Sequence, residues 1–246
     1  MANAMDQAMT SRGAGPRALR WHDRVTEPSL TVLVALEVFA LFLATPLADM
    51  GFTSTIADLA LVLLMLGSGM AVVWRNRTAT VTIAGAFVVG LLTALLRQGS
   101  PSTLTICVDF IAKLAFLATL TWVVGGAVFG PGRVTFHRIR GAVAIYLQIS
   151  MMFTFLYLLM VRLAPGAFSP AIHLSGPTGD VLRGAKGGGQ MVYFSLVTIT
   201  SIGYGDIVPV HPLVRSFATL EAVIGQLYPA TILARLVTLE LEGRRR

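Results

Sequence analysis

Charged side chains are scarce in this chain of 246 residues, at 13% of the sequence, whereas a soluble domain carries about 25%. Cysteine occurs once, at Cys107, which excludes an intrachain disulfide. The sequence also has no His/Cys cluster with the spacing of a metal site, no Ser-His-Asp order and no phosphate-binding loop. These absences give no indication of an enzyme, and we expect neither catalytic residues nor a bound cofactor.

Hydrophobic residues, by contrast, make up 55% of the chain and gather in six long runs. At about 1.5 Å per residue, each run is long enough to cross a hydrocarbon core of roughly 30 Å. The runs cover residues 30–47, 55–74, 78–96, 104–124, 143–160 and 213–237. This pattern predicts an all-α integral membrane protein with six transmembrane helices.

The basic residues indicate how such a chain would be oriented. The net charge is +7, and a chain with six spans has both ends on one side of the membrane. Thirteen of the 19 Lys and Arg residues then lie on the side of the termini and five on the other, with Lys113 inside a span. Because cytoplasmic loops are enriched in Lys and Arg, we expect a multi-pass protein of the cell (plasma or inner) membrane with both termini in the cytoplasm. This explains the positive charge without nucleic acid as a partner.

Near the C-terminus, residues 198–206 form the run Thr-Ile-Thr-Ser-Ile-Gly-Tyr-Gly-Asp. Gly203 and Gly205 lie where a left-handed backbone would help to aim successive carbonyl groups at one axis, and glycine adopts such φ values readily. The run resembles the signature of potassium channels, Thr-x-Thr-Thr-Val-Gly-Tyr-Gly-Asp. Ser201 stands for the last threonine and Ile202 for the valine, so a hydroxyl and a β-branched side chain are kept.

This resemblance implies a selectivity filter, in which a ring of carbonyl oxygens replaces the water shell of a potassium ion. One chain supplies one pore loop and the ring needs four, so the resemblance also implies a homotetramer. The filter residues that it implies are Thr200, Ser201, Ile202, Gly203, Tyr204 and Gly205, with K+ bound at Ser201, Ile202, Gly203 and Tyr204. K+ is then the permeant ion rather than a cofactor.

About fifty residues separate the fifth and sixth runs. Residues 165–190, with their prolines and glycines, are predicted to form a flexible outer turret, and residues 191–200 a short re-entrant pore helix that ends at the filter. Side chains expected to support the filter are Tyr193, Phe194, Thr198, Asp206 and Glu221. The two aromatic residues either brace the filter or simply pack their helix. Asp206 either anchors the outer turn and adds negative potential at the pore mouth or is an ordinary turn residue.

The sixth span is expected to line the inner half of the pore. Gly225 lies twenty residues after Gly205, and the resemblance to potassium channels implies a glycine hinge of the inner helix at this spacing. Pro229, one turn later, removes a backbone hydrogen bond and can kink the same helix. Both residues are candidates for a gate hinge, and the alternative is a static kink. Glu221 lies one turn before Gly225, at a membrane depth where an acidic residue is costly. Its side chain either hydrogen-bonds the back of the pore helix, which we favour, or faces the cavity.

The fourth span lacks the repeated arginines of a voltage-sensing helix. It holds only Lys113, with Asp109 four residues earlier, and we predict that these two residues pair. Glu37 and Asp58 are other candidate partners of Lys113. One charge per subunit gives only a shallow voltage dependence, so we expect a leak-like or weakly gated conductance.

Together these features predict a potassium-selective channel that conducts K+ passively. Two alternatives stay open: a less selective monovalent cation channel and, in a different class, a secondary transporter or membrane enzyme. Membrane lipids are expected partners, with Arg244 to Arg246 either contacting anionic lipid or staying solvated. The predicted domains are a disordered basic cytosolic tail (1–28), an arginine-poor four-helix transmembrane domain with voltage-sensor-like topology (29–129), a cytosolic linker (130–141), the pore domain (142–237) and a short basic cytosolic tail (238–246).

Overall fold

The computed structural model describes residues 30–49, 67, 80–85, 88–89, 92, 103–129, 136–170 and 186–244. The predicted second and third spans lie mostly outside these residues, as do the N-terminal tail and Asp58. The described part of the chain is mostly helical.

Four of its helices are long and apolar enough to cross a membrane. These stretches are Leu30–Leu47, Thr103–Gly126, Arg138–Leu163 and Pro212–Arg235, and they coincide with the first, fourth, fifth and sixth runs. The first continues through a five-residue π-helix, η1 (Ala40–Ala44), into α3 (Thr45–Asp49). The others belong to α6 (Thr103–Val128), α7 (Phe136–Leu163) and α9 (Pro212–Arg244).

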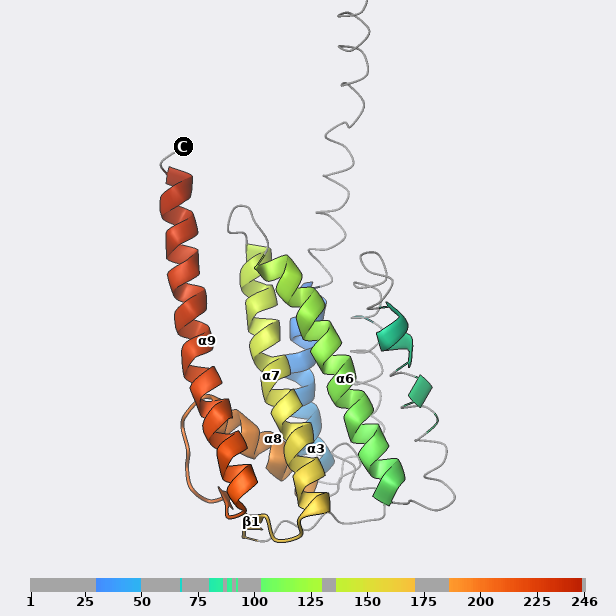
Figure 1. Ribbon diagram of the computed structural model, residues 1–246. Helices are drawn as coiled ribbons and strands as arrows, with labels where there is room; N and C mark the ends of the chain where they lie inside the picture. The colour runs from blue at the N-terminus through green and yellow to red at the C-terminus, as the bar shows by residue number, and fades with distance from the viewer. Residues whose placement is uncertain are drawn as a thin grey trace, which may run out of the picture.

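Helix α7 lies at the centre of the arrangement. Residues 30–49, α6 and α7 lie side by side, α9 stands on the other side of α7, and the short helix α8 (Lys186–Ile199) lies at one end between α7 and α9 (Figure 1). The buried core extends through these contacts and includes Phe110, Leu120, Ala144, Tyr157, Leu158 and Met191. One face of α7 therefore packs against α6 and the N-terminal helix, and the other packs against α8 and α9.

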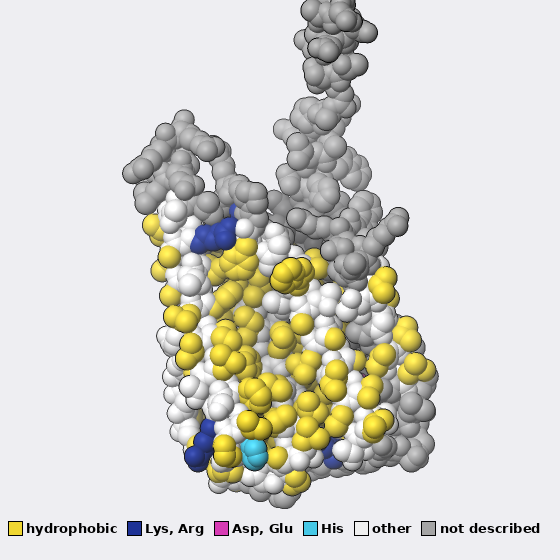
Figure 2. All heavy atoms as spheres, viewed as in Figure 1, with side chains coloured by type: hydrophobic (Ala, Val, Ile, Leu, Met, Phe, Trp, Pro, Cys, Tyr) yellow, Lys and Arg dark blue, Asp and Glu magenta, His cyan; other side chains and the backbone are white. Residues whose placement is uncertain are grey.

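The outer surface of the bundle is apolar. Figure 2 shows hydrophobic side chains spread over the described face, with Lys and Arg side chains only near its two ends. Leu104 is 73% exposed and Trp122 is 80% exposed, although both are large and apolar. A soluble monomer rarely exposes so continuous an apolar surface. The apolar helices and this surface are those of a membrane protein.

A small two-stranded sheet lies at one end of the bundle. Strand β1 (Phe168–Ser169) pairs antiparallel with β2 (Val208–Pro209), with Phe168 opposite Pro209. The amide groups of Val210 and His211 also donate to the carbonyl of Ala167, at 2.9 and 3.2 Å. This sheet thus holds the segment after residues 200–206 against the segment that follows α7.

Helix boundaries differ from the sequence prediction at three places. Helix α8 begins at Lys186, so the prediction that residues 186–190 belong to the turret is wrong. Gly188 and Gly189 are buried, and close packing there offsets the cost of about 1 kcal/mol that a glycine adds to a helix. Helix α7 begins within the predicted linker, and α9 continues to Arg244 through most of the predicted tail.

Candidate functional site

The backbone after α8 alternates in handedness. Ser201, Gly203 and Gly205 have φ values of +57°, +54° and +79°, so every second residue is left-handed. In a regular strand successive carbonyl groups point to opposite sides, and reversing the handedness of alternate residues turns them toward the same side. Ser201 is the one non-glycine residue with positive φ in the described chain, and such a conformation is strained.

The amide groups of this segment point back at α8. The carbonyl of Val197 accepts hydrogen bonds from the amides of Ile202 and Gly203, at 2.9 and 3.2 Å, and that of Thr198 accepts from Ser201 at 2.9 Å. Among the described residues, no donor bonds to the carbonyl oxygens of residues 201–205. The first three residues of the segment, 201–203, therefore donate their N–H groups to α8, and the carbonyl oxygens of residues 201–205 stay available for a cation.

Every residue from Thr200 to Asp206 is exposed in the single chain. Ile202 is 55% exposed and Tyr204 is 70% exposed. These two large side chains leave apolar surface uncovered in the single chain.

The two aromatic residues of α8 have different roles. The ring of Tyr193 stacks on that of Tyr204, with centroids 6.4 Å apart and planes 1° apart. Tyr193 lies outside the four candidate spans, and desolvation and a hydrogen bond to Asp206 raise the pKa of its phenol. Phe194 instead packs edge-on against Tyr157 and Phe168. Of the predicted pair, Tyr193 therefore contacts residues 200–206, and Phe194 packs in the core.

Helix α7 holds α8 from behind through a stripe of polar residues that the sequence analysis missed. The hydroxyl of Tyr146 donates to the carbonyl of Ile199, the last residue of α8, at 3.0 Å. One turn later Ser150 contacts Ser195 of α8, with 2.9 Å between the two hydroxyl oxygens. The spacing of Tyr146, Ser150, Thr154 and Tyr157 places all four on one face of an otherwise apolar helix, which is the signal that could have identified them.

Glu221 of α9 completes this cluster and is fully buried. Its Oε2 accepts a hydrogen bond from the Tyr157 hydroxyl at 2.6 Å, and its Oε1 is hydrogen-bonded to Ser195. The carboxyl group therefore lies on the back of α8, which is the favoured of the two positions considered for it.

Gly225 lies where α9 crosses the end of α8. A Cβ atom on this residue would be 1.8 Å from the carbonyl oxygen of Ile199. Close approach of two backbones explains the glycine, which the sequence analysis considered as a candidate hinge with a static kink as the alternative. Pro229 lies inside α9, which the structure shows as one helix from Pro212 to Arg244.

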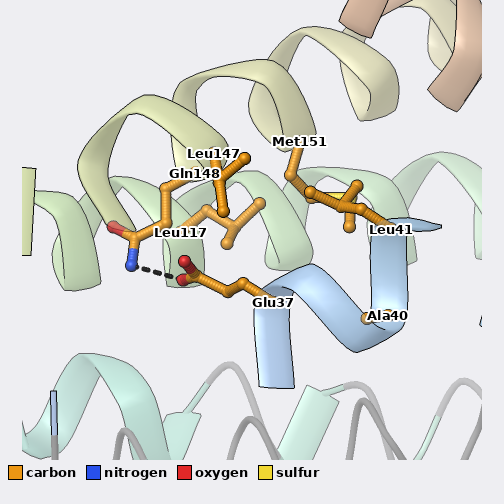
Figure 3. Close-up of a pocket in the computed structure, with 7 residues that line it drawn as sticks. All are labelled: Glu37, Ala40, Leu41, Leu117, Leu147, Gln148 and Met151. Carbon is orange, nitrogen blue, oxygen red and sulfur yellow. Dashed lines mark hydrogen bonds between the residues drawn. The ribbon is translucent and has the colours of Figure 1, made fainter. Parts of the chain in front are cut away.

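Lys113 and Glu37 on the remaining helices have different kinds of partner. Lys113 bonds Asp109 at 2.7 Å, which confirms that predicted pair, and its ammonium group lies over the ring of Phe155. Glu37 does not pair with Lys113. It accepts a hydrogen bond of 2.7 Å from Gln148, beside a small, mostly apolar cavity (Figure 3). Within the described residues, no group of three His, Cys, Asp or Glu side chains is placed to hold a metal ion.

Comparisons with known proteins bear on the same region. Residues 168–241, which include β1, α8, β2 and most of α9, match the ion channel family model Ion_trans_2. The inward rectifier potassium channel Kirbac3.1 of Paramagnetospirillum magnetotacticum is 41% identical over 51 residues, which are 20% of this chain and 17% of that protein. The match thus leaves out most of both proteins. No solved structure matches the chain.

Proposed function

We propose that this chain is a subunit of a potassium channel and that residues 200–205 form its selectivity filter. The observation that carries the proposal is the backbone of residues 201–205, where alternating handedness and amide bonds to α8 free the carbonyl oxygens on one side. Such a row can replace the hydration shell of K+. The ion channel match and the similarity to a potassium channel support this proposal.

The working unit is a homotetramer. One chain has one filter segment, and the oxygens of a single chain cannot enclose an ion. The exposure of Ile202 and Tyr204, and the burial of only 11% of the apolar window of α9, supply the surface on which further copies pack. Four copies bring their filter segments to a common axis, with α9 of each copy lining the inner half of the pore.

The conductance is passive and selective for K+, and both termini are cytoplasmic. Helix α8 enters the membrane and ends there, which is tolerated because it is buried in protein and faces the water-filled cavity. Its C-terminal end carries partial negative charge toward the pore, which favours a cation. Lys113 is neutralised by Asp109, so α6 contributes little gating charge and the channel is leak-like or weakly gated.

The test is ion flux through the purified protein in sealed lipid vesicles. A K+ gradient should produce flux, and replacing K+ by Na+ should suppress it. Equal fluxes of the two ions would favour a less selective cation channel, and uptake that requires a proton gradient would favour a transporter.

A further inference from the structure

The hydroxyl of Ser195 lies at the centre of a buried cluster of polar side chains formed with Ser150, Tyr157 and Glu221. Three oxygen atoms surround the Ser195 Oγ: the carbonyl oxygen of Ser150 at 2.7 Å, the Ser150 Oγ at 2.9 Å and the Glu221 Oε1 at 2.5 Å. Ser150, Ser195 and Glu221 are all fully buried, so water does not complete their hydrogen bonds.

The number of hydrogen atoms available for these contacts decides whether Glu221 is an ionised carboxylate or a neutral carboxylic acid. A serine hydroxyl has one hydrogen to donate and two lone pairs to accept with, whereas a carbonyl oxygen only accepts. The Ser195 hydrogen therefore goes to the Ser150 carbonyl. The contacts with the Ser150 hydroxyl and with Glu221 must then be donations to Ser195. An ionised Glu221 has no hydrogen to donate, so Ser195 would need two hydrogen atoms, one for the Ser150 carbonyl and one for Glu221.

We propose that Glu221 is a neutral carboxylic acid that donates its proton to Ser195, and that it positions the pore helix α8 through this bond. The four hydrogen bonds then form one satisfied chain: Tyr157 donates to Glu221, Glu221 to Ser195, Ser195 to the Ser150 carbonyl, and the Ser150 hydroxyl to Ser195. A buried polar network is stable when every member is satisfied. The effect on conduction rests on the channel function proposed above, whereas the proton on Glu221 does not.

The surroundings of Glu221 agree with a neutral group. The elements packed against it are α7 and α8, which present the titratable Tyr157 and Tyr146 and the uncharged Ser150 and Ser195. Among the described helices α6 to α9, the observed ion pair is Lys113 with Asp109, and no cation contacts Glu221. An unpaired buried charge is costly, and a group in such a place usually neutralises instead.

Infrared difference spectroscopy of the full chain in lipid tests the proton directly. Subtracting the spectrum of Glu221→Gln from that of the wild type at neutral pH should reveal the C=O stretch of a protonated acid. Glu37→Gln serves as the matched control, because it removes another buried carboxyl group. The spectrum of this variant should still contain the Glu221 band. Ser195→Ala, which removes the acceptor and keeps Glu221, should shift the band. A carboxylate band in the first difference spectrum overturns the proposal.

Flux measurements test the positioning role separately. Raising the pH until Glu221 ionises removes one hydrogen atom from this network of hydrogen bonds. Wild-type K+ flux should then fall about tenfold, the effect expected from losing one buried hydrogen bond. Glutamine donates to Ser195 and accepts from Tyr157 as the neutral acid does, so Glu221→Gln should keep its flux at alkaline pH. Equal alkaline losses in both proteins overturn the positioning role. A protonated-acid band in a protein that conducts no K+ at any pH contradicts the channel function and leaves the proton assignment standing.

Discussion

Single glycines at the filter and behind it meet different physical demands. Gly203 has a left-handed backbone in open space, since no atom lies within 4 Å of where its Cβ would be. Gly225 has an ordinary helical backbone but no room, because the Ile199 carbonyl lies in the place of a Cβ. Substitution at the first should therefore change the path of the carbonyls, and substitution at the second should separate two helices.

Gly203→Ala should abolish K+ flux while the protein still inserts and assembles. An alanine held in the left-handed region costs about 1–2 kcal/mol, and the segment can relieve this strain by rotating its carbonyls away from the axis. Gly166→Ala is the matched control, because Gly166 also has positive φ, at +82°, and open space but lies outside the filter. Undiminished vesicle flux in Gly203→Ala would argue against the filter assignment.

Gly225→Ala should lower thermal stability, because the added methyl group collides with backbone that has no rotamer to change. Overpacking of this kind costs about 1–3 kcal/mol or more. Gly126→Ala, whose Cβ would meet nothing within 4 Å, is the control and should melt like the wild type. The measurement is the melting temperature of each protein in detergent. An unchanged melting temperature for Gly225→Ala, combined with altered opening, would instead support the hinge that the sequence analysis proposed.

At the scale of elements, α7 supports α8, the helix that leads into the proposed filter. Its polar stripe holds the end of α8 through Tyr146 and the middle of α8 through Ser150. It reaches α9 through Tyr157 and through the carbonyl of Ala142, which accepts from the Tyr228 hydroxyl at 2.9 Å. The rings of Tyr146 and Tyr228 also stack, with centroids 6.0 Å apart.

These two tyrosines offer a matched pair of variants. Tyr146→Phe removes the hydrogen bond to the last carbonyl of α8, and Tyr228→Phe removes one to α7 away from the filter. Each loses about 1 kcal/mol of hydrogen bonding. We expect only Tyr146→Phe to reduce the preference for K+ over Na+ several-fold in vesicle flux. Equal effects of the two variants would mean that the support is general rather than directed at the filter.

The sequence predicted this level of structure unevenly. Apolar runs located the four described spans, because a membrane imposes a minimum length of apolar helix. The start of α8 was missed, because Gly187 to Gly189 form a loop pattern in the sequence, whereas in the structure they are helical and Gly188 and Gly189 are buried. Glu221 was singled out by its charge, but its partners Ser195 and Tyr157 were not. The spacing of polar residues along α7 could have marked a contact face, but which residues meet there depends on how the helices pack.

For the whole molecule, the proposed channel needs more than one chain. The apolar window of α7 is 56% buried within one chain, whereas that of α9 is only 11% buried. Leu213, Leu227 and Leu233 of α9 are each more than half exposed. Lipid can cover some of this surface, but lipid cannot cover the exposed polar backbone of the filter, because unsatisfied backbone groups in hydrocarbon cost several kcal/mol each.

Native mass spectrometry of the protein released from detergent should therefore give four times the mass of one chain, which is 26.2 kDa. Gly203→Ala should give the same tetramer, because the filter strain does not remove the α9 surface. A monomer as the largest species would leave the filter backbone without partners and would contradict the assembly.

The most direct test is a map of the assembled protein in lipid nanodiscs with K+ present. The account predicts four copies around one axis, with the carbonyl oxygens of residues 201–205 facing it and ion density between successive oxygen rings. The same map collected in Na+ alone should lose or rearrange that density. Residues 201–205 turned away from a shared axis, or packed within a single copy, would contradict the account.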